Sequence, residues 1–273
     1  MSANIEKIGF IGAGNMANAM VKGLLESNLY VKEQITVSDK DIGAVNRFSE
    51  QFGVNGSRRN TDLVGESSII VLSIKPQNMK DVLYEIQGDI MDNHLIISIA
   101  AGIPLKMIHS NLKRDIPLVR VMPNTPALIQ KGISAIAAGE FATEEHLNTS
   151  RKIFDSVGET VTVDESMMDA VTALSGSGPG YVFRIMESMV EAGTKVGLER
   201  KIALDLVIQT FLGAAHLAKV SDESLSTLRE RVTSPGGTTA AGLRVFEELD
   251  LEGTIVKAIK AANDRSIELG KTD

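Results

Sequence analysis

The chain has 273 residues, enough for one large domain or two modest ones. It contains no cysteine, which excludes disulfides and thiolate metal sites, and its net charge of −7 argues against nucleic acid as the main partner. Hydrophobic residues at 43% and charged residues at 23% are ordinary for a globular protein.

The first half of the chain alternates short apolar runs with amphipathic stretches. The apolar runs predict buried strands at residues 7–11, 35–38, 68–73, 94–98 and 118–121. Stretches such as 41–51 and 75–86 predict helices between them. This alternation indicates βαβ units and a parallel sheet. The first run begins so early that we expect no signal peptide and a cytoplasmic protein.

A glycine-rich loop follows the first predicted strand. Gly12, Gly14 and Ala17 have the spacing of the dinucleotide-binding fingerprint. The first glycine makes a tight turn, the second lets the backbone approach a pyrophosphate, and the small third residue allows close helix–strand packing. Because the loop lies between a strand and a helix, we expect Gly12, Gly14, Asn15 and Met16 to bind a dinucleotide.

The end of the second predicted strand bears on the choice of cofactor. Asp39 stands where an acidic residue binds the ribose 2′-hydroxyl and repels a 2′-phosphate. Ser38 before it and Lys40 after it make this interpretation less clear. Three arginines can also reach an adenosine phosphate, namely Arg47, Arg58 and Arg59. The sequence therefore leaves both NADH and NADPH open.

Further cofactor contacts are expected where the other strands end, because open α/β sheets bind ligands beside the carboxyl ends of their strands. The candidates after the third, fourth and fifth strands are Ser73, Lys75, Ala100, Met122, Asn124 and Thr125. Pro123 and Pro126 make the loop around Asn124 rigid, which suits a binding site.

From about residue 165 the strand-like runs stop and helical patterns follow one another. These patterns lie at 166–174, 181–196, 201–220, 225–231, 238–249 and 251–269. We therefore predict two domains, a dinucleotide-binding domain over 1–163 and an all-helical domain over 164–273. The 201–220 helix is apolar on nearly every side, and we expect a second subunit to cover part of it. Asp205 and His216 within it argue against a membrane span.

Two loops of the helical half carry hydroxyls. The glycine-rich loop 175–180 can bring Ser177 to a substrate pocket. The turn from Ser234 to Thr239 precedes a helix, and such a turn can hold a small carboxylate. None of the four histidines is placed as a catalytic base. A site of hydroxyls and backbone N–H groups suits reduction of a C=N bond, whose nitrogen needs only a hydrogen-bond donor.

These segments together resemble the pyrroline-5-carboxylate reductase family from one end of the chain to the other. The matching residues lie at 8–17, 75–76, 98–102, 120–126, 173–179 with Tyr181, and 232–239. The last segment corresponds to the family's signature region and is the most specific.

The resemblance implies a Rossmann domain followed by an all-helical dimerisation domain, a homodimer and, in some members, a larger ring. It implies NAD(P)H-dependent reduction of L-1-pyrroline-5-carboxylate to L-proline, the last step of proline biosynthesis. Ser234, Gly237 and Thr239 would hold the substrate carboxylate, with Thr239 donating to the ring nitrogen.

For the cofactor, the resemblance implies that Asn60 touches the adenosine ribose, with Ser38 near its 2′ position. Met122, Asn124 and Thr125 would border the nicotinamide. Asp39 and Lys40 depart from the residues common after the family's second strand, so the cofactor preference stays undecided.

Two other functions remain to be weighed. A β-hydroxyacid dehydrogenase shares the two-domain layout but needs a lysine shortly after a Gly-x-Gly loop, and here none occurs between Gly178 and Lys195. A non-catalytic NAD(P)-sensing module would not need the turn from Ser234 to Thr239 to form a carboxylate pocket.

Overall fold

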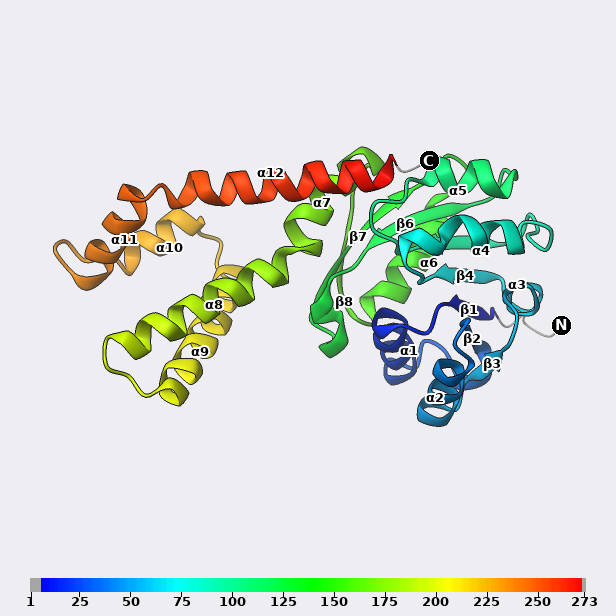
Figure 1. Cartoon of the computed structure of the whole chain (residues 1–273), viewed down its shortest axis with the longest axis horizontal. Helices are drawn as coiled ribbons and strands as arrows, with labels where there is room; N and C mark the ends of the chain where they lie inside the picture. Colours follow the sequence, from blue (N-terminus) through cyan, green and yellow to red (C-terminus); the bar gives the residue numbers. More distant parts are fainter. Residues whose placement is uncertain (1–5, 272–273) are drawn as a thin grey trace. The chain divides into compact units, whose positions relative to one another are not determined.

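A computed structural model describes residues 6–271 of the chain (Figure 1). The chain forms two compact units. The first contains the residues up to Ser177 and those from Ala262 onward, and the second contains Gly178–Ala261. The domain boundary at 163/164 stays a prediction.

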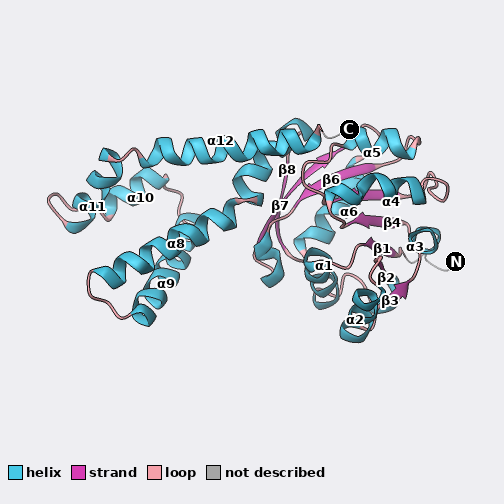
Figure 2. Cartoon of the chain, in the orientation of Figure 1, coloured by secondary structure: helices cyan, strands magenta, loops and turns pink. Residues whose placement is uncertain are grey.

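An eight-stranded sheet with the order β3-β2-β1-β4-β5-β6-β7-β8 forms the centre of the first unit (Figure 2). The strands are β1 (Ile8–Ile11), β2 (Ile35–Ser38), β3 (Asn55–Ser57), β4 (Ile69–Leu72), β5 (Leu95–Ser98), β6 (Leu118–Met122), β7 (Gly132–Ala138) and β8 (Gly158–Thr162). Every residue of β1, β2, β4 and β5 is buried. This explains their continuous apolar runs, because helices cover both faces of the sheet.

Six helices form the two covering layers. They are α1 (Asn15–Glu26), α2 (Ile42–Phe52), α3 (Asn60–Glu66), α4 (Met79–Ile86), α5 (Leu105–Leu112) and α6 (Glu144–Asp155). Ile69 and Val71 pack in the core under α1, α2 and α6. Ile70 and Leu72 pack in the core under α3, α4 and α5. Successive residues of one strand thus belong to opposite cores, as the pleat of a strand requires.

The sheet differs from the predicted all-parallel one at one edge. β7 runs antiparallel to β6, and β8 then pairs with β7 in parallel. β3, β7 and β8 were not predicted, nor were α3, α5 and α6. β3 and β8 lack a buried apolar face, and β7 is rich in alanine with only two large apolar residues, so none of the three shows the apolar run that predicts a strand.

The chain after β8 forms three short helical pieces where one helix was predicted. They are η4 (Glu165–Met167), α7 (Met168–Val171) and the π-helical η5 (Thr172–Gly176). Met168 packs with Ala135 and Ala137 of β7. Arg120 of β6 is buried and forms an ion pair with Glu165 at 3.6 Å. Burial lowers the pKa of Arg120, while Glu165 and Asp169 favour its charged form.

The C-terminal turns of α12 (Leu251–Gly270) also belong to the first unit. Ser266 is buried and its hydroxyl donates a hydrogen bond to Asp169 Oδ1 at 2.6 Å. At Gly102, where φ is +73°, a Cβ would lie 3.1 Å from Cβ of Leu269, so the backbone and the helix are in close contact. The end of the chain therefore helps to complete the unit that its beginning forms.

The second unit consists of helices. They are α8 (Gly178–Lys195), α9 (Arg200–Val220), α10 (Leu225–Arg231), α11 (Thr238–Glu248) and the first part of α12. Val190 of α8 packs against Ala203 and Val207 of α9. Much of α9 nevertheless stays exposed in the single chain, including Ile202, Leu204, Leu206, Ile208, Leu212 and Leu217. By length and composition, α9 is the one helix among residues 6–271 that could cross a membrane.

We expect Gly158→Ala to destabilise the protein by about 3 kcal/mol, because the added Cβ would overlap the Gly132 carbonyl in the adjacent strand. Gly65→Ala in α3 is the matched control, since its Cβ would meet nothing within 4 Å and alanine favours a helix by about 0.5–1 kcal/mol. Urea unfolding measures both changes. Equal stabilities of the two variants would contradict the close approach of β7 and β8.

Candidate functional site

The glycine loop after β1 makes two tight backbone contacts. The Gly12 N–H donates to the Ser38 carbonyl at 2.7 Å, which ties the loop to the end of β2. Gly12 has φ of +107°, and a Cβ there would lie 2.5 Å from the Ser73 carbonyl oxygen. Only glycine fits a position that combines this φ with so close an approach.

Helix α1 starts from this loop with a free N-terminus. Gly14 is its N-cap residue, no side chain caps the helix, and its first turn contains no acidic residue. A Cβ on Gly14 would meet nothing within 4 Å, so the space above the helix N-terminus is open. Open N–H groups and the helix dipole favour a phosphate group there. The glycine loop and the first residues of α1, Asn15 and Met16, therefore fit a dinucleotide pyrophosphate.

Ser73, after β4, supports the glycine loop, and Ala100 lies after β5. The Ser73 hydroxyl is 3.0 Å from the Ile11 carbonyl and 2.8 Å from the Gly12 carbonyl, and it can donate to either. Ser73 therefore holds the glycine loop in shape. Ala100 is buried, whereas Lys75 is exposed where the chain turns into η2 (Pro76–Asn78). The direct cofactor contacts expected of these three residues stay predictions.

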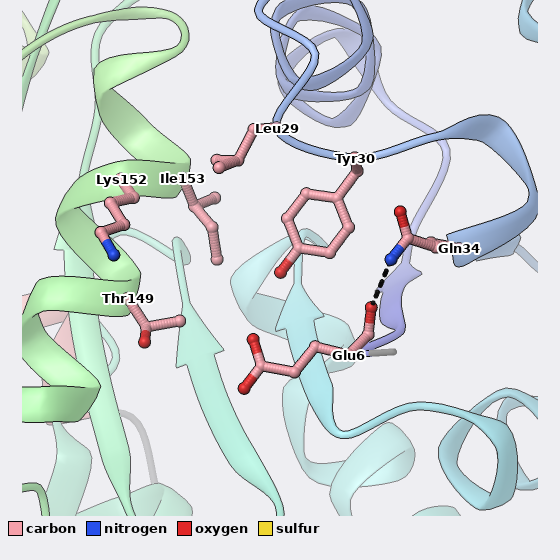
Figure 3. A pocket seen from close by; sticks show the side chains of 7 residues that line it. All are labelled: Glu6, Leu29, Tyr30, Gln34, Thr149, Lys152 and Ile153. Atoms are coloured by element: carbon pink, nitrogen blue, oxygen red, sulfur yellow. Dashed lines mark hydrogen bonds between the residues drawn. The ribbon is translucent and has the colours of Figure 1, made fainter. Parts of the chain in front are cut away.

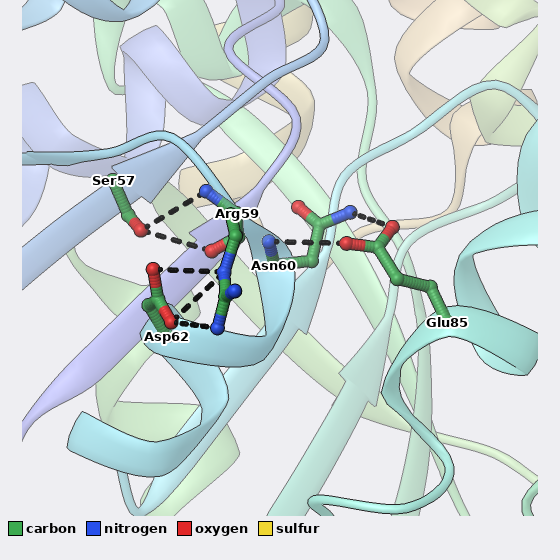
Figure 4. Close-up of polar contacts among 5 residues, drawn as sticks. All are labelled: Ser57, Arg59, Asn60, Asp62 and Glu85. Carbon is green, nitrogen blue, oxygen red and sulfur yellow. Dashed lines mark hydrogen bonds and ion pairs between the residues drawn. The ribbon is translucent and has the colours of Figure 1, made fainter.

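A chain of hydrogen bonds runs from the end of β2 to helix α4, and Figure 4 shows its Asn60–Glu85 part. The Ser38 hydroxyl donates to Asn60 Oδ1 at 2.7 Å. Asn60 donates to Glu85 through its side chain at 2.7 Å and through its backbone N–H at 3.3 Å. Glu85 was not predicted from the sequence, because one exposed carboxylate on an amphipathic helix gives no signal of a partner on another helix.

Asp39 lies directly after β2 and uses both carboxylate oxygens. Oδ2 accepts a hydrogen bond from the Ala13 N–H at 2.8 Å, and Oδ1 accepts one from the Asp41 N–H at 2.9 Å. The carboxylate is half-buried beside the glycine loop. Two charge-assisted bonds from backbone groups fix its position.

Asn124 links the loop after β6 to the η5 segment. Its side-chain amide donates to the Ser175 carbonyl at 3.2 Å, and its side-chain oxygen accepts from the Ile133 N–H at 3.0 Å. Met122 lies against the same segment, because a Cβ on Gly176 would come 2.5 Å from its terminal methyl group. The structure thus brings Met122 and Asn124 together with residues 175–176. Thr125 is exposed at the start of η3 (Thr125–Ile129), and Ser177 follows η5.

In the second unit, the turn from Ser234 to Thr239 leads into α11 and leaves its hydroxyls available. Gly236 has φ of +73°, and the Gly237 N–H donates to the Ser234 carbonyl at 2.9 Å. Gly237 is the N-cap residue of α11, no side chain caps the helix, and its first turn contains no acidic residue. The hydroxyls of Ser234 and Thr239 therefore do not serve as helix caps, and the turn keeps the donors that a carboxylate needs.

Three of the four histidines make structural contacts. His94 is buried, which lowers its pKa, and its Nδ1 accepts from the Met91 N–H at 3.0 Å. His109 lies 2.9 Å from Asp115. His146 completes the capping box of α6 with Thr143. His216 lies on α9 and is exposed in the single chain.

The first unit also contains a pocket (Figure 3). It is lined by Glu6, Leu29, Tyr30, Gln34, Thr149, Lys152 and Ile153. Glu6 and Gln34 precede β1 and β2, so the pocket lies at the amino ends of these strands, opposite the end where α/β sheets bind ligands. Burial and, to a lesser extent, the charge of Glu6 raise the pKa of Tyr30 to about 12, so its hydroxyl stays protonated.

Two family models match the chain. One, described as pyrroline-5-carboxylate reductase dimerisation, matches residues 165–269. The other, described as NADP oxidoreductase coenzyme F420-dependent, matches residues 7–102. The chain is also 41% identical over 266 residues to a pyrroline-5-carboxylate reductase of Methanosarcina acetivorans, and the match covers 97% of this chain and 98% of the relative.

Solved structures show the same fold. A pyrroline-5-carboxylate reductase from Coxiella burnetii superimposes with a TM-score of 0.91 at 36% identity, covering 98% of this chain and 100% of that one. The Plasmodium falciparum enzyme with NADP bound gives a TM-score of 0.88 at 32% identity, covering 98% and 99%. A Rossmann-type unit followed by a helical dimerisation region is thereby confirmed.

Replacing the two glycines of the loop should have different effects. Gly14→Ala places a methyl group in the open space above α1, so we expect dinucleotide binding to weaken at least roughly tenfold while the stability changes by less than about 0.5 kcal/mol. Gly12→Ala should instead destabilise the fold by about 1–3 kcal/mol through its φ and its contact with Ser73. Calorimetric titration and thermal melting separate the two effects. Unchanged binding by the Gly14 variant would contradict this placement of the pyrophosphate.

Proposed function

The chain belongs to the pyrroline-5-carboxylate reductase family, and on that premise we propose how its residues divide the work of the reaction. The protein reduces the C=N bond of L-1-pyrroline-5-carboxylate to give L-proline, with a nicotinamide cofactor as the electron donor. A β-hydroxyacid dehydrogenase or a non-catalytic sensing module is not favoured.

The glycine loop binds the cofactor pyrophosphate through Gly12, Gly14, Asn15 and Met16. The bound nicotinamide supplies a hydride to the carbon of the C=N bond. Met122, Asn124 and Thr125 border the nicotinamide, with Ser73, Lys75 and Ala100 at the neighbouring strand ends. The two hydrogen bonds of Asn124 keep its loop in one conformation, which favours a single orientation of the ring.

Ser234, Gly237 and Thr239 hold the substrate carboxylate, and Ser177 lines the pocket. The Thr239 hydroxyl donates a hydrogen bond to the ring nitrogen. When hydride adds to the carbon, the C=N π pair moves to the nitrogen. A nitrogen protonated beforehand becomes the neutral amine directly, and a neutral nitrogen takes its proton from water. A hydroxyl donor is enough for this step, because no proton has to be removed from the substrate. The observation that carries this assignment is the α11 N-terminus, where no side chain caps the helix.

The helical region mediates oligomerisation, as its family match indicates. We propose that it forms a homodimer, and possible larger rings, through the exposed apolar residues of α9. Leu206, Leu212 and Leu217 are more than half exposed in one chain, an arrangement typical of an interface and costly in water. A subunit interface accounts for the exposed apolar residues of α9 without a membrane span, and it agrees with a cytoplasmic enzyme.

The activity test uses purified protein with L-1-pyrroline-5-carboxylate and either NADH or NADPH, and it follows the loss of nicotinamide absorbance and the formation of proline. Thr239→Ala should lower turnover roughly a hundredfold, because it removes the donor to the nitrogen. Thr238→Ala is the matched control, since the adjacent hydroxyl has no assigned role, and we expect nearly wild-type turnover. Failure of the wild-type enzyme to oxidise either nucleotide would contradict the proposed function, and a fully active Thr239 variant would contradict only the role of Thr239.

A further inference from the structure

We propose that the protein prefers NADH to NADPH, because Asp39 next to Ser38, and Glu85 behind Asn60, place two carboxylates near the residue expected at the 2′ position of the adenosine ribose. The inference rests on the proposed function, since it assumes that the dinucleotide binds at the glycine loop. The preference concerns this chain's own residues. The structure of the P. falciparum enzyme contains NADP, whereas in this chain the charges of Asp39 and Glu85 would repel the 2′-phosphate of NADPH.

Asp39 is the first of these carboxylates. Ile11 and Ser38 are partners in the β1–β2 register, so the residue after Ser38 lies beside the glycine loop. The bond from the Ala13 N–H to Asp39 Oδ2 confirms that contact. A carboxylate has about four acceptor positions, and the two backbone bonds use two of them. The remaining lone pairs can accept from ribose hydroxyls, which are donors, but not from a phosphate, which has only acceptors to offer.

Glu85 is the second carboxylate. It accepts two hydrogen bonds from Asn60 (Figure 4). The side-chain oxygen of Asn60 in turn accepts from Ser38 at the end of β2. With its Nδ2 group engaged by Glu85 and its Oδ1 by Ser38, the Asn60 side chain is held in one orientation. The negative charge of Glu85 therefore lies in direct contact with Asn60, the residue expected to touch the adenosine ribose.

Two of the nearby arginines are engaged by other carboxylates. Arg59 Nε lies 3.1 Å from each Asp62 carboxylate oxygen, and its Nη2 lies 2.6 Å from Oδ1 (Figure 4). Arg47 lies 3.4 Å from Asp41. Lys40 and Arg58 are exposed cations, so solvent screens their attraction for a phosphate more than it screens the half-buried Asp39.

The balance of charge then favours the cofactor without a 2′-phosphate. A phosphate monoester carries about −1.5 to −2 charges and offers acceptors only. Beside Asp39 it would face repulsion and an acceptor-to-acceptor contact, and the desolvated carboxylate would lose its interaction with water. A 2′-hydroxyl in the same place donates to the carboxylate instead.

The test is calorimetric titration of the full-length protein with NADH and with NADPH, without substrate. We expect NADH to bind at least roughly tenfold more tightly, a ratio equivalent to about 1.4 kcal/mol. Because the preference is electrostatic, the ratio should narrow as ionic strength rises from about 0.01 M to about 1 M. Equal or tighter binding of NADPH, or a ratio independent of salt, would overturn the inference.

Two variants test the residues themselves. Asp39→Asn keeps the size of the side chain and removes its charge, so the ratio of NADH affinity to NADPH affinity should fall by roughly tenfold. Glu85→Gln should lower the same ratio by a smaller factor. Glu66→Gln, an exposed carboxylate at the opposite end of α3 from Asn60, is the charge-matched control and should leave the ratio unchanged. The ratio is diagnostic even if Asp39→Asn loosens the loop, because a loosened loop weakens both dinucleotides alike.

An unchanged ratio in Asp39→Asn would overturn the inference while leaving the proposed function intact. Failure of both dinucleotides to bind the wild-type protein would overturn the two together. Tight, NADH-selective binding by a protein that does not reduce L-1-pyrroline-5-carboxylate would overturn the proposed reaction alone.

Discussion

The close approach of the β1 and β4 ends at Gly12 is the contact on which the rest of the first unit depends. Ser73 holds the backbone of Ile11 and Gly12 from one side, and the Ser38 carbonyl accepts the Gly12 N–H from the other. Three neighbouring strands therefore fix where α1 begins. Because the helix N-terminus and the end of β2 are set by the same loop, the places for the pyrophosphate and for the adenosine ribose are set together.

Residues whose function depends on local backbone geometry could be predicted from the sequence. The spacing of Gly12 and Gly14 after an apolar run was enough to place the loop, because that spacing reports a turn and a close approach within one segment. Strands β1, β2, β4, β5 and β6 were predicted for a similar reason, since burial on both faces leaves a continuous apolar run.

Features that depend on distant contacts could not be predicted in this way. Glu85 reaches Asn60 from another helix, and Asp39 reaches Ala13 across two strands, so neither partner is visible in a local pattern. The antiparallel β7 was missed because glycine and alanine give little hydrophobic periodicity. The exposure of α9 in one chain agrees with the expectation that part of its cover comes from another subunit, an inference from its apolar composition.

The return of α12 to the first unit has a consequence for how the protein is made. Ser266 meets Asp169, and the turn at Gly102 packs against the helix near Leu269, so residues far apart in the sequence lie together in the first unit. A ribosome releases the amino-terminal sheet long before it releases these last turns. The nascent Rossmann-type unit therefore stays incomplete, with the surface around Gly102 uncovered, until residues 262–270 have been synthesised.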